Sequence, residues 1–84
     1  MMNPPAPLVP YLPQTWPRVS RRQLECLFWV QEGKSANDIG GILGISGRTV
    51  ERHLQLACAL LGVRTRVQAV LRARDLGLLA PAKH

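Results

Sequence analysis

From residue 19 onward, apolar residues recur at intervals of three and four, which is the spacing of amphipathic helices. Four such stretches are separated by short breaks, and they predict helices over about 21–32, 36–43, 47–61 and 66–76. No segment alternates apolar and polar residues as a strand does, and no hairpin signal is present. The pattern therefore predicts an all-α domain of four helices.

The same spacing predicts which side chains form the core. We expect the following to face inward, helix by helix: Leu24, Leu27, Phe28 and Val30 or Gln31; Ile39, Ile42 and Leu43; Val50, Leu54, Ala57 and Leu61; Val67, Val70, Leu71 and Leu76. In the third helix Leu56 and Leu60 fall outside this stripe, so we expect both to be partly exposed.

The breaks carry start and stop signals for the helices. A hydroxyl residue that can cap free N–H groups precedes each helix: Ser20, Ser35, Ser46 and Thr65. A possible capping-box partner lies three residues later, and it is weakest in the third case: Gln23, Asp38, Thr49 and Gln68. A glycine, which adopts positive φ without strain, closes each helix: Gly33, Gly44, Gly62 and Gly77.

The first 17 residues contain six of the seven prolines, which disfavour both a helix and a central strand. We therefore predict an extended Pro-rich tail over 1–18, a helical domain over 19–80 and a short C-terminal tail over 81–84. The tail also carries Tyr11, Leu12 and Trp16. These side chains could cover the helical core, or they could dock on a partner as a peptide-like motif.

Charge narrows the choice of partner. The net charge is +6 and the pI is about 10.8, which favours a polyanion, either nucleic acid or an acidic membrane surface. No apolar run approaches the ~20 residues that span a bilayer, and the N-terminus lacks a secretory signal pattern. We therefore expect a cytoplasmic protein that does not use a membrane.

Cys26 and Cys58 lie in apolar helical patterns and form no CxxC pair, and neither histidine clusters with them. We predict buried free thiols, no metal site and no cofactor. His53 is expected to be a packed residue at the core edge. The acidic residues are dispersed, and no phosphate loop or nucleophile motif is present, so an enzyme is not expected.

The segment LGIS, residues 43–46, joins the second and third helices in the manner of a helix-turn-helix. Gly44 lets the chain reverse, Ile45 fills the angle between the helices, and Ser46 caps the third helix. A capped helix N-terminus can face a phosphate through its free N–H groups. In a helix-turn-helix the second of the two helices enters the major groove of DNA.

Residues 19–79 resemble the LuxR-type, or GerE-like, helix-turn-helix domain of bacterial transcription regulators. The resemblance rests on the segments VSRRQLECL, EGKSANDIGGILGIS, TVERHL and LGVRTRVQAVLRA. Trp29 and the words GKS and LGLL are most similar to the C-terminal domain of acyl-homoserine-lactone receptors. The last domain of sigma factors has a similar motif, but it carries an arginine-rich run where this chain has Glu51, Arg52 and His53, so the LuxR type is favoured.

The resemblance implies sequence-specific binding to double-stranded DNA by a transcription regulator, with residues 47–61 in the major groove. It places Glu51, Arg52 and Gln55 on the groove-facing side, where these side-chain types can contact cytosine, guanine and adenine respectively. Residues at or near helix N-termini suit phosphate contacts, although each single arginine could equally be a solvated surface residue: Lys34, Ser35, Ser46, Arg48, Thr49, Arg64 and Arg66.

The resemblance also implies a dimer formed through the fourth helix, and we expect Ala69, Ala73 and Leu76 at its interface. Leu76, with Leu78 and Leu79, could instead fold back on its own core. Relatives of this type carry a sensor domain before the helix-turn-helix, which 18 residues are too few to form.

One departure from the family keeps a second function open. Family members carry basic or polar residues near the end of the third helix, where this chain has LACALLG with Leu56 and Leu60. Adjoining exposed apolar residues suggest a contact surface. The alternative is a small protein that pairs with another LuxR-type regulator or an RNA polymerase component, and modulates it without specific DNA binding of its own.

Overall fold

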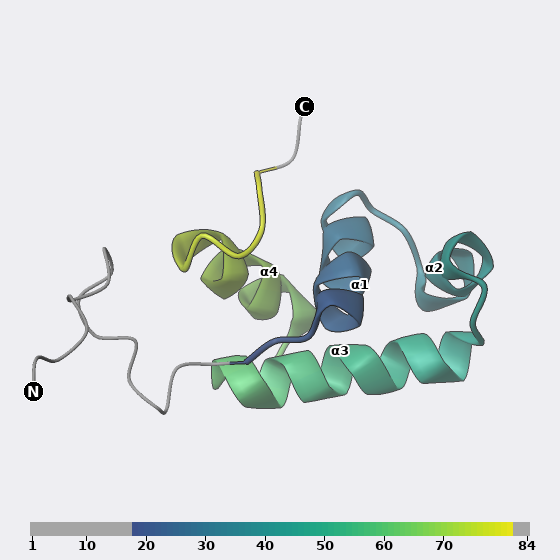
Figure 1. The fold of residues 1–84 in the computed structure, drawn as a ribbon, viewed down its shortest axis with the longest axis horizontal. Helices are drawn as coiled ribbons and strands as arrows, with labels where there is room; N and C mark the ends of the chain where they lie inside the picture. Colours follow the sequence, from purple (N-terminus) through teal and green to yellow (C-terminus); the bar gives the residue numbers. More distant parts are fainter. Residues whose placement is uncertain (1–17, 82–84) are drawn as a thin grey trace, which may run out of the picture.

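The computed structural model describes residues 18–81. Within that range the chain forms four helices and no strand, which confirms the all-α prediction (Figure 1). The helices are α1 (Arg21–Gln31), α2 (Ala36–Leu43), α3 (Gly47–Leu61) and α4 (Arg66–Asp75). The predictions made for the N-terminal tail, including those for Tyr11, Leu12 and Trp16, lie outside the described residues.

All four predicted N-caps are confirmed, and three of them form full capping boxes: Ser20 with Gln23, Ser35 with Asp38, and Thr65 with Gln68. The cap of α3 is different. The Ser46 hydroxyl accepts from the backbone N–H of Thr49 at 3.0 Å, while the two hydroxyl groups hydrogen-bond to each other at 2.9 Å. Thr49 therefore supports the cap through its own hydroxyl, and it does not reach back to the Ser46 backbone as a glutamine does.

The turn between α2 and α3 brings the two backbones unusually close. Gly44 has a φ of 75°, a left-handed conformation that glycine adopts without strain. The backbone N–H of Ile45 donates to the Gly40 carbonyl at 2.9 Å. A Cβ atom added to Gly40 would lie 2.5 Å from the Ile45 carbonyl oxygen, so this position has no room for a side chain. This contact fixes where α3 leaves the turn.

The α1 and α3 helices each contact all three other helices, whereas α2 and α4 do not contact each other. Figure 1 shows α2 and α4 at opposite ends of the domain, with α1 between them and α3 running along one edge. Every residue predicted for the core stripe of α3 is buried: Val50, Leu54, Ala57 and Leu61. The other helices contribute Cys26, Leu27, Ile39, Ala69, Val70 and Ala73.

Three of the residues predicted to face inward are exposed instead. Ile42 of α2 is 46% exposed, and in α4 Val67 and Leu71 are 64% and 50% exposed. The α4 helix instead turns Ala69 and Ala73 to the core, both 0% exposed. Small side chains let a helix approach its neighbours closely, so α4 packs through Ala69 and Ala73 together with Val70, and it leaves Val67 and Leu71 outside.

The same observation corrects two of the three predicted dimer residues, Ala69 and Ala73. Ala69 and Ala73 are fully buried within the domain and cannot face a second copy. Leu76 is partly buried and, with Leu78, packs against the core that includes Leu79. The fold-back alternative is therefore the arrangement that the C-terminal segment adopts.

A polar network ties that segment to α1 and α4. Gln31 donates from Nε2 to the Ala80 carbonyl at 2.9 Å, and Arg74 donates from Nε to Gln31 Oε1 at 2.9 Å.

Among residues 18–81 no single helix is long and apolar enough to cross a bilayer, although α3 and α4 together, bent by 54°, meet the criteria of length and composition.

Candidate nucleic-acid interface

The α3 helix has one buried face and one open face. Its apolar stripe packs against the other helices, which all lie on the same side of it in Figure 1. Arg52 and Gln55 are exposed, and Glu51 is partly exposed. Because these three positions are spaced i, i+1 and i+4, they share the open side of a helix of 15 residues. The structure therefore brings the three predicted base-contact residues onto one accessible surface.

The N-terminus of α3 lies at one end of that surface. Ser46 is exposed and caps the helix, and Arg48 is exposed in the first turn. The first turn contains no acidic residue. A helix N-terminus carries a partial positive charge, and here no acidic side chain offsets it while an arginine lies beside it. Such an end is favourable for an anion such as a phosphate.

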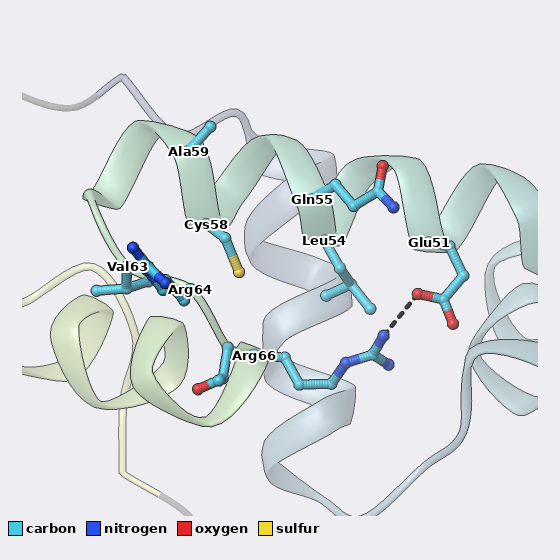
Figure 2. A pocket seen from close by; sticks show the side chains of 9 residues that line it. Glu51, Leu54, Gln55, Cys58, Ala59, Val63, Arg64 and Arg66 are labelled. Atoms are coloured by element: carbon cyan, nitrogen blue, oxygen red, sulfur yellow. Dashed lines mark hydrogen bonds and ion pairs between the residues drawn. The ribbon is translucent and has the colours of Figure 1, made fainter.

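An ion pair links the middle of α3 to the start of α4. Arg66 donates from Nη2 to Glu51 Oε1 at 2.5 Å, and the two side chains are 40% and 46% exposed (Figure 2). Glu51 was predicted to be a base contact and Arg66 a phosphate contact, and no feature of the sequence predicted that they pair. They are 15 positions apart, so no helical spacing relates them.

A groove of about 510 Å³ runs beside this pair, between α3 and the start of α4. It is lined by Glu51, Leu54, Gln55, Cys58, Ala59, Val63, Arg64, Thr65 and Arg66. Figure 2 shows Gln55 on the same side of α3 as Glu51, and Arg64 on the segment that enters α4. The groove thus gathers four of the residues predicted to contact DNA: Glu51, Gln55, Arg64 and Arg66.

Both cysteines are free, as the sequence predicts. Burial raises the pKa of the Cys26 thiol, an effect that nearby Arg22 partly opposes. Burial also raises the pKa of the Cys58 thiol, and Arg66 opposes this shift. Cys58 lines the groove but is only partly buried, whereas Cys26 is fully buried in the core. Neither thiol is thereby activated as a nucleophile.

Comparison with known proteins agrees with this geometry. The family model described as "Bacterial regulatory proteins, luxR family" matches residues 18–73. The chain belongs to this family. The solved structure of the transcription factor GerE superposes with a TM-score of 0.70 and 34% identity, covering 73% of this chain and 91% of that one. The match supports the LuxR type and not the sigma-factor alternative.

Two curated relatives are much longer than the segment that matches this chain. The chain is 43% identical over 60 residues to the transcriptional activator protein AhyR of Aeromonas hydrophila, covering 71% of this chain and 23% of the relative. It is 46% identical over 55 residues to the transcriptional activator protein LuxR of Aliivibrio fischeri, covering 66% and 22% respectively. The chain therefore spans about a quarter of the length of these relatives.

Two of the predicted phosphate contacts lie elsewhere in this LuxR-family domain. Lys34 and Ser35 precede α2, and the Ser35 hydroxyl accepts from the backbone N–H of Asp38 at 3.1 Å. Lys34 lines a separate hollow of about 490 Å³ with Asn37, Asp38, Gly41 and Ile42. Neither residue lines the α3–α4 groove, and of the seven predicted phosphate contacts that groove contains only Arg64 and Arg66.

His53 is partly buried, in agreement with the prediction of a residue at the core edge. Its Nδ1 atom is buried without a hydrogen-bond partner among the described residues. Within that part of the chain no group of three histidine, cysteine or acidic residues could hold a metal ion.

The second half of the open face of α3 is apolar. Leu56 and Leu60 are each 42% exposed, which confirms their predicted position outside the core stripe. Arg52 lies on the same i, i+4 row, so a single helix surface changes from polar at its N-terminal half to apolar at its C-terminal half.

Proposed function

We propose that this chain is a sequence-specific DNA-binding transcription regulator that inserts the N-terminal half of α3 into the major groove. The observation that carries the proposal is the open face of α3. Arg52 and Gln55 project from it, and the helix is held by a turn in which α2 and α3 approach too closely for any side chain at Gly40. Membership of a family of regulatory proteins, with relatives named transcriptional activators, supports the same function.

The base contacts we propose are Glu51, Arg52 and Gln55. Arginine can donate to both acceptors of guanine, glutamine can pair with the edge of adenine, and a carboxylate can accept from the amino group of cytosine. Phosphate contacts would position the helix without reading sequence. For these we propose the α3 cap region and the start of α4, with Lys34 and Ser35 as outlying contacts: Ser46, Arg48, Thr49, Arg64 and Arg66.

The test of base reading compares Arg52→Ala and Gln55→Ala with Arg21→Ala. Arg21 lies on α1 with a side chain that is 93% exposed, so its loss removes a positive charge without disturbing the fold. Each α3 variant should lose on the order of 1–3 kcal/mol on the preferred duplex and relax preference at one base pair. Arg21→Ala should keep the preference. If both α3 variants bind the preferred duplex as tightly as the parent, α3 is not the reader.

We also propose a dimer through α4, now with a different surface from the one first expected. Val67 and Leu71 are exposed and line a hollow of about 270 Å³ with Val30, Val70 and Arg74, among others. A twofold dimer doubles the number of base pairs that a small domain reads, with half-sites about one helical turn apart.

The dimer is tested by sedimentation of the parent, Leu71→Glu and Leu56→Glu. Two glutamates brought together at a twofold seam repel each other, so Leu71→Glu should be monomeric. Leu56→Glu places the same charge on α3 and should leave the dimer intact. A parent that remains monomeric both free and bound to a palindromic duplex removes α4 as the dimer element.

The exposed Leu56 and Leu60 favour a second candidate function. Such a patch suits contact with another LuxR-type regulator or an RNA polymerase component, with modulation in place of specific DNA binding. Recovery of DNA crosslinked to the protein in cells separates the two functions. Enriched sites support the first, and an absence of enrichment supports the second. For either function we propose a location in the bacterial cytoplasm.

A further inference from the structure

The Glu51–Arg66 pair raises a question that the proposed function leaves open, because the two residues were assigned to different kinds of DNA contact. Arg66 Nη2 donates to Glu51 Oε1 (Figure 2), and both residues line the α3–α4 groove. We infer that Arg66 is a positioning residue for sequence recognition. It holds the Glu51 carboxylate on the open face of α3 so that Glu51 reads a cytosine, and the inference rests on the proposed function.

The Glu51–Arg66 ion pair is expected to contribute little to the stability of the folded domain. Both side chains are almost half exposed, and ion pairs that are solvated to this degree contribute little to folding. The pair also joins two different helices, so the helical spacing that stabilises pairs such as Arg22 with Glu25 does not apply. Its effect is therefore expected on the surface chemistry of the groove.

Electrostatics explains why a glutamate on this surface needs a partner. An isolated carboxylate close to DNA is repelled by the phosphates, so it opposes binding to every sequence alike. The adjacent guanidinium of Arg66 makes the local charge neutral. Glu51 can then discriminate between bases at a smaller general cost in affinity.

The geometry of the pair leaves one oxygen of the Glu51 carboxylate for a base. The pair holds one carboxylate oxygen, Oε1, and a carboxylate has a second oxygen that can accept a further hydrogen bond. Fixing a long side chain before binding also lowers the entropy lost when the complex forms. In the major groove the amino group of cytosine is the donor that a carboxylate recognises. The base pair opposite Glu51 should therefore be G·C, with cytosine on the strand that Glu51 contacts.

The experiment selects preferred sites from randomised duplexes with the parent, Glu51→Ala, Arg66→Gln and the double variant. In the parent we expect a cytosine preference on the order of tenfold at one position. Glu51→Ala and Arg66→Gln should each reduce it to about twofold or less, and the double variant should lose no more than either single variant, because the two residues act as one unit.

The matched control is Arg64→Gln, which removes the same charge from the same groove but not from the pair. It should weaken binding to all duplexes by one common factor and keep the cytosine preference. If Arg66→Gln behaves in this way too, Arg66 is only a phosphate contact and the inference is wrong. A stronger cytosine preference in Arg66→Gln contradicts it as well, because Arg66 would then be withholding Glu51 from the base.

A conservative variant guards against a folding defect. Arg66→Lys keeps a charged donor that can reach one carboxylate oxygen, and it should retain more of the cytosine preference than Arg66→Gln. Equal loss in both, with unchanged melting temperatures, contradicts a positioning role. If the parent prefers no sequence over random duplex, the proposed function itself is wrong. If the parent has a cytosine preference that Arg66 does not influence, the proposed function stands and only the role of Arg66 is wrong.

Discussion

The α3 and α4 helices differ in which apolar residues they bury. The α3 helix buries Val50, Leu54 and Leu61 and exposes polar side chains on its N-terminal half, with Leu56 and Leu60 exposed further along. The α4 helix buries Val70 with the small residues Ala69 and Ala73, and it exposes Val67 and Leu71. Helical spacing shows that a stripe of apolar residues exists. It does not show which of two adjacent stripes faces inward when one consists of small side chains and the other of large ones.

The difference has a functional meaning. A helix that presents polar groups outward suits a hydrated partner such as DNA, whereas exposed branched residues on a closely packed helix suit an apolar partner. This difference supports the proposals that α3 recognises DNA and that α4 contacts a second copy. Substitutions on the buried and exposed sides of α3 and α4 test how each helix packs.

Ala73→Glu should unfold the domain, whereas Leu71→Glu should not. Ala73 is 0% exposed, and a buried ion without a partner carries a penalty of several kcal/mol, which is comparable to the stability of a small domain. Leu71 is 50% exposed, so its charge stays in water. Circular dichroism during heating measures both. A folded Ala73→Glu with the melting temperature of the parent would show that α4 does not pack through its alanines.

Leu54→Ala and Leu56→Ala compare the two sides of α3. Leu54 is 2% exposed, so truncating it should lower the free energy of unfolding by about 2–5 kcal/mol. Leu56 is 42% exposed, and its truncation should change that free energy by no more than about 0.5 kcal/mol. Urea denaturation gives both values. Similar losses at the two positions would mean that Leu56 is covered in solution.

Stability should also fall at alkaline pH because of the buried thiol of Cys26. Burial raises the pKa of this thiol above its ordinary value of 9.0, so in the unfolded chain the proton leaves at lower pH than in the folded one. The stabilising effect is complete below pH 9 and is lost as the pH rises further, with a slope of up to about 1.4 kcal/mol per pH unit. Urea denaturation between pH 7 and pH 10.5 should show a shallower decline for Cys26→Ala. Parallel curves for parent and variant would contradict this assignment.

Local chemistry made most of the fold predictable. The caps at Ser20, Ser35, Ser46 and Thr65 depend on residues within three positions of each other, and all four helix starts were predicted correctly. The core stripe of α3 was also predictable, because its residues extend along the whole helix, whereas the competing row of Leu56 and Leu60 is confined to the C-terminal half. In α4 two stripes compete, and the choice between them depends on how closely α1 and α3 approach.

The candidate site was predictable to a smaller extent. Arg52 and Gln55 are exposed on α3 as expected, and Leu56 and Leu60 are exposed beyond them. The Glu51–Arg66 pair was missed because it depends on the angle between α3 and α4, which no local pattern specifies. The signal available in the sequence was opposite charge on the two sides of the glycine-containing turn after α3, at Gly62.

Recognition of DNA sequence by α3 is tested by the ratio of two affinities. The measurement is fluorescence anisotropy of the full chain on its selected duplex and on a random duplex of equal length, at one near-physiological salt concentration. The selected duplex should bind roughly 10³-fold or more tightly than the random duplex, a ratio typical of specific recognition. Equal affinity for the two duplexes would contradict it, because attraction of a basic protein to phosphates alone gives no such difference.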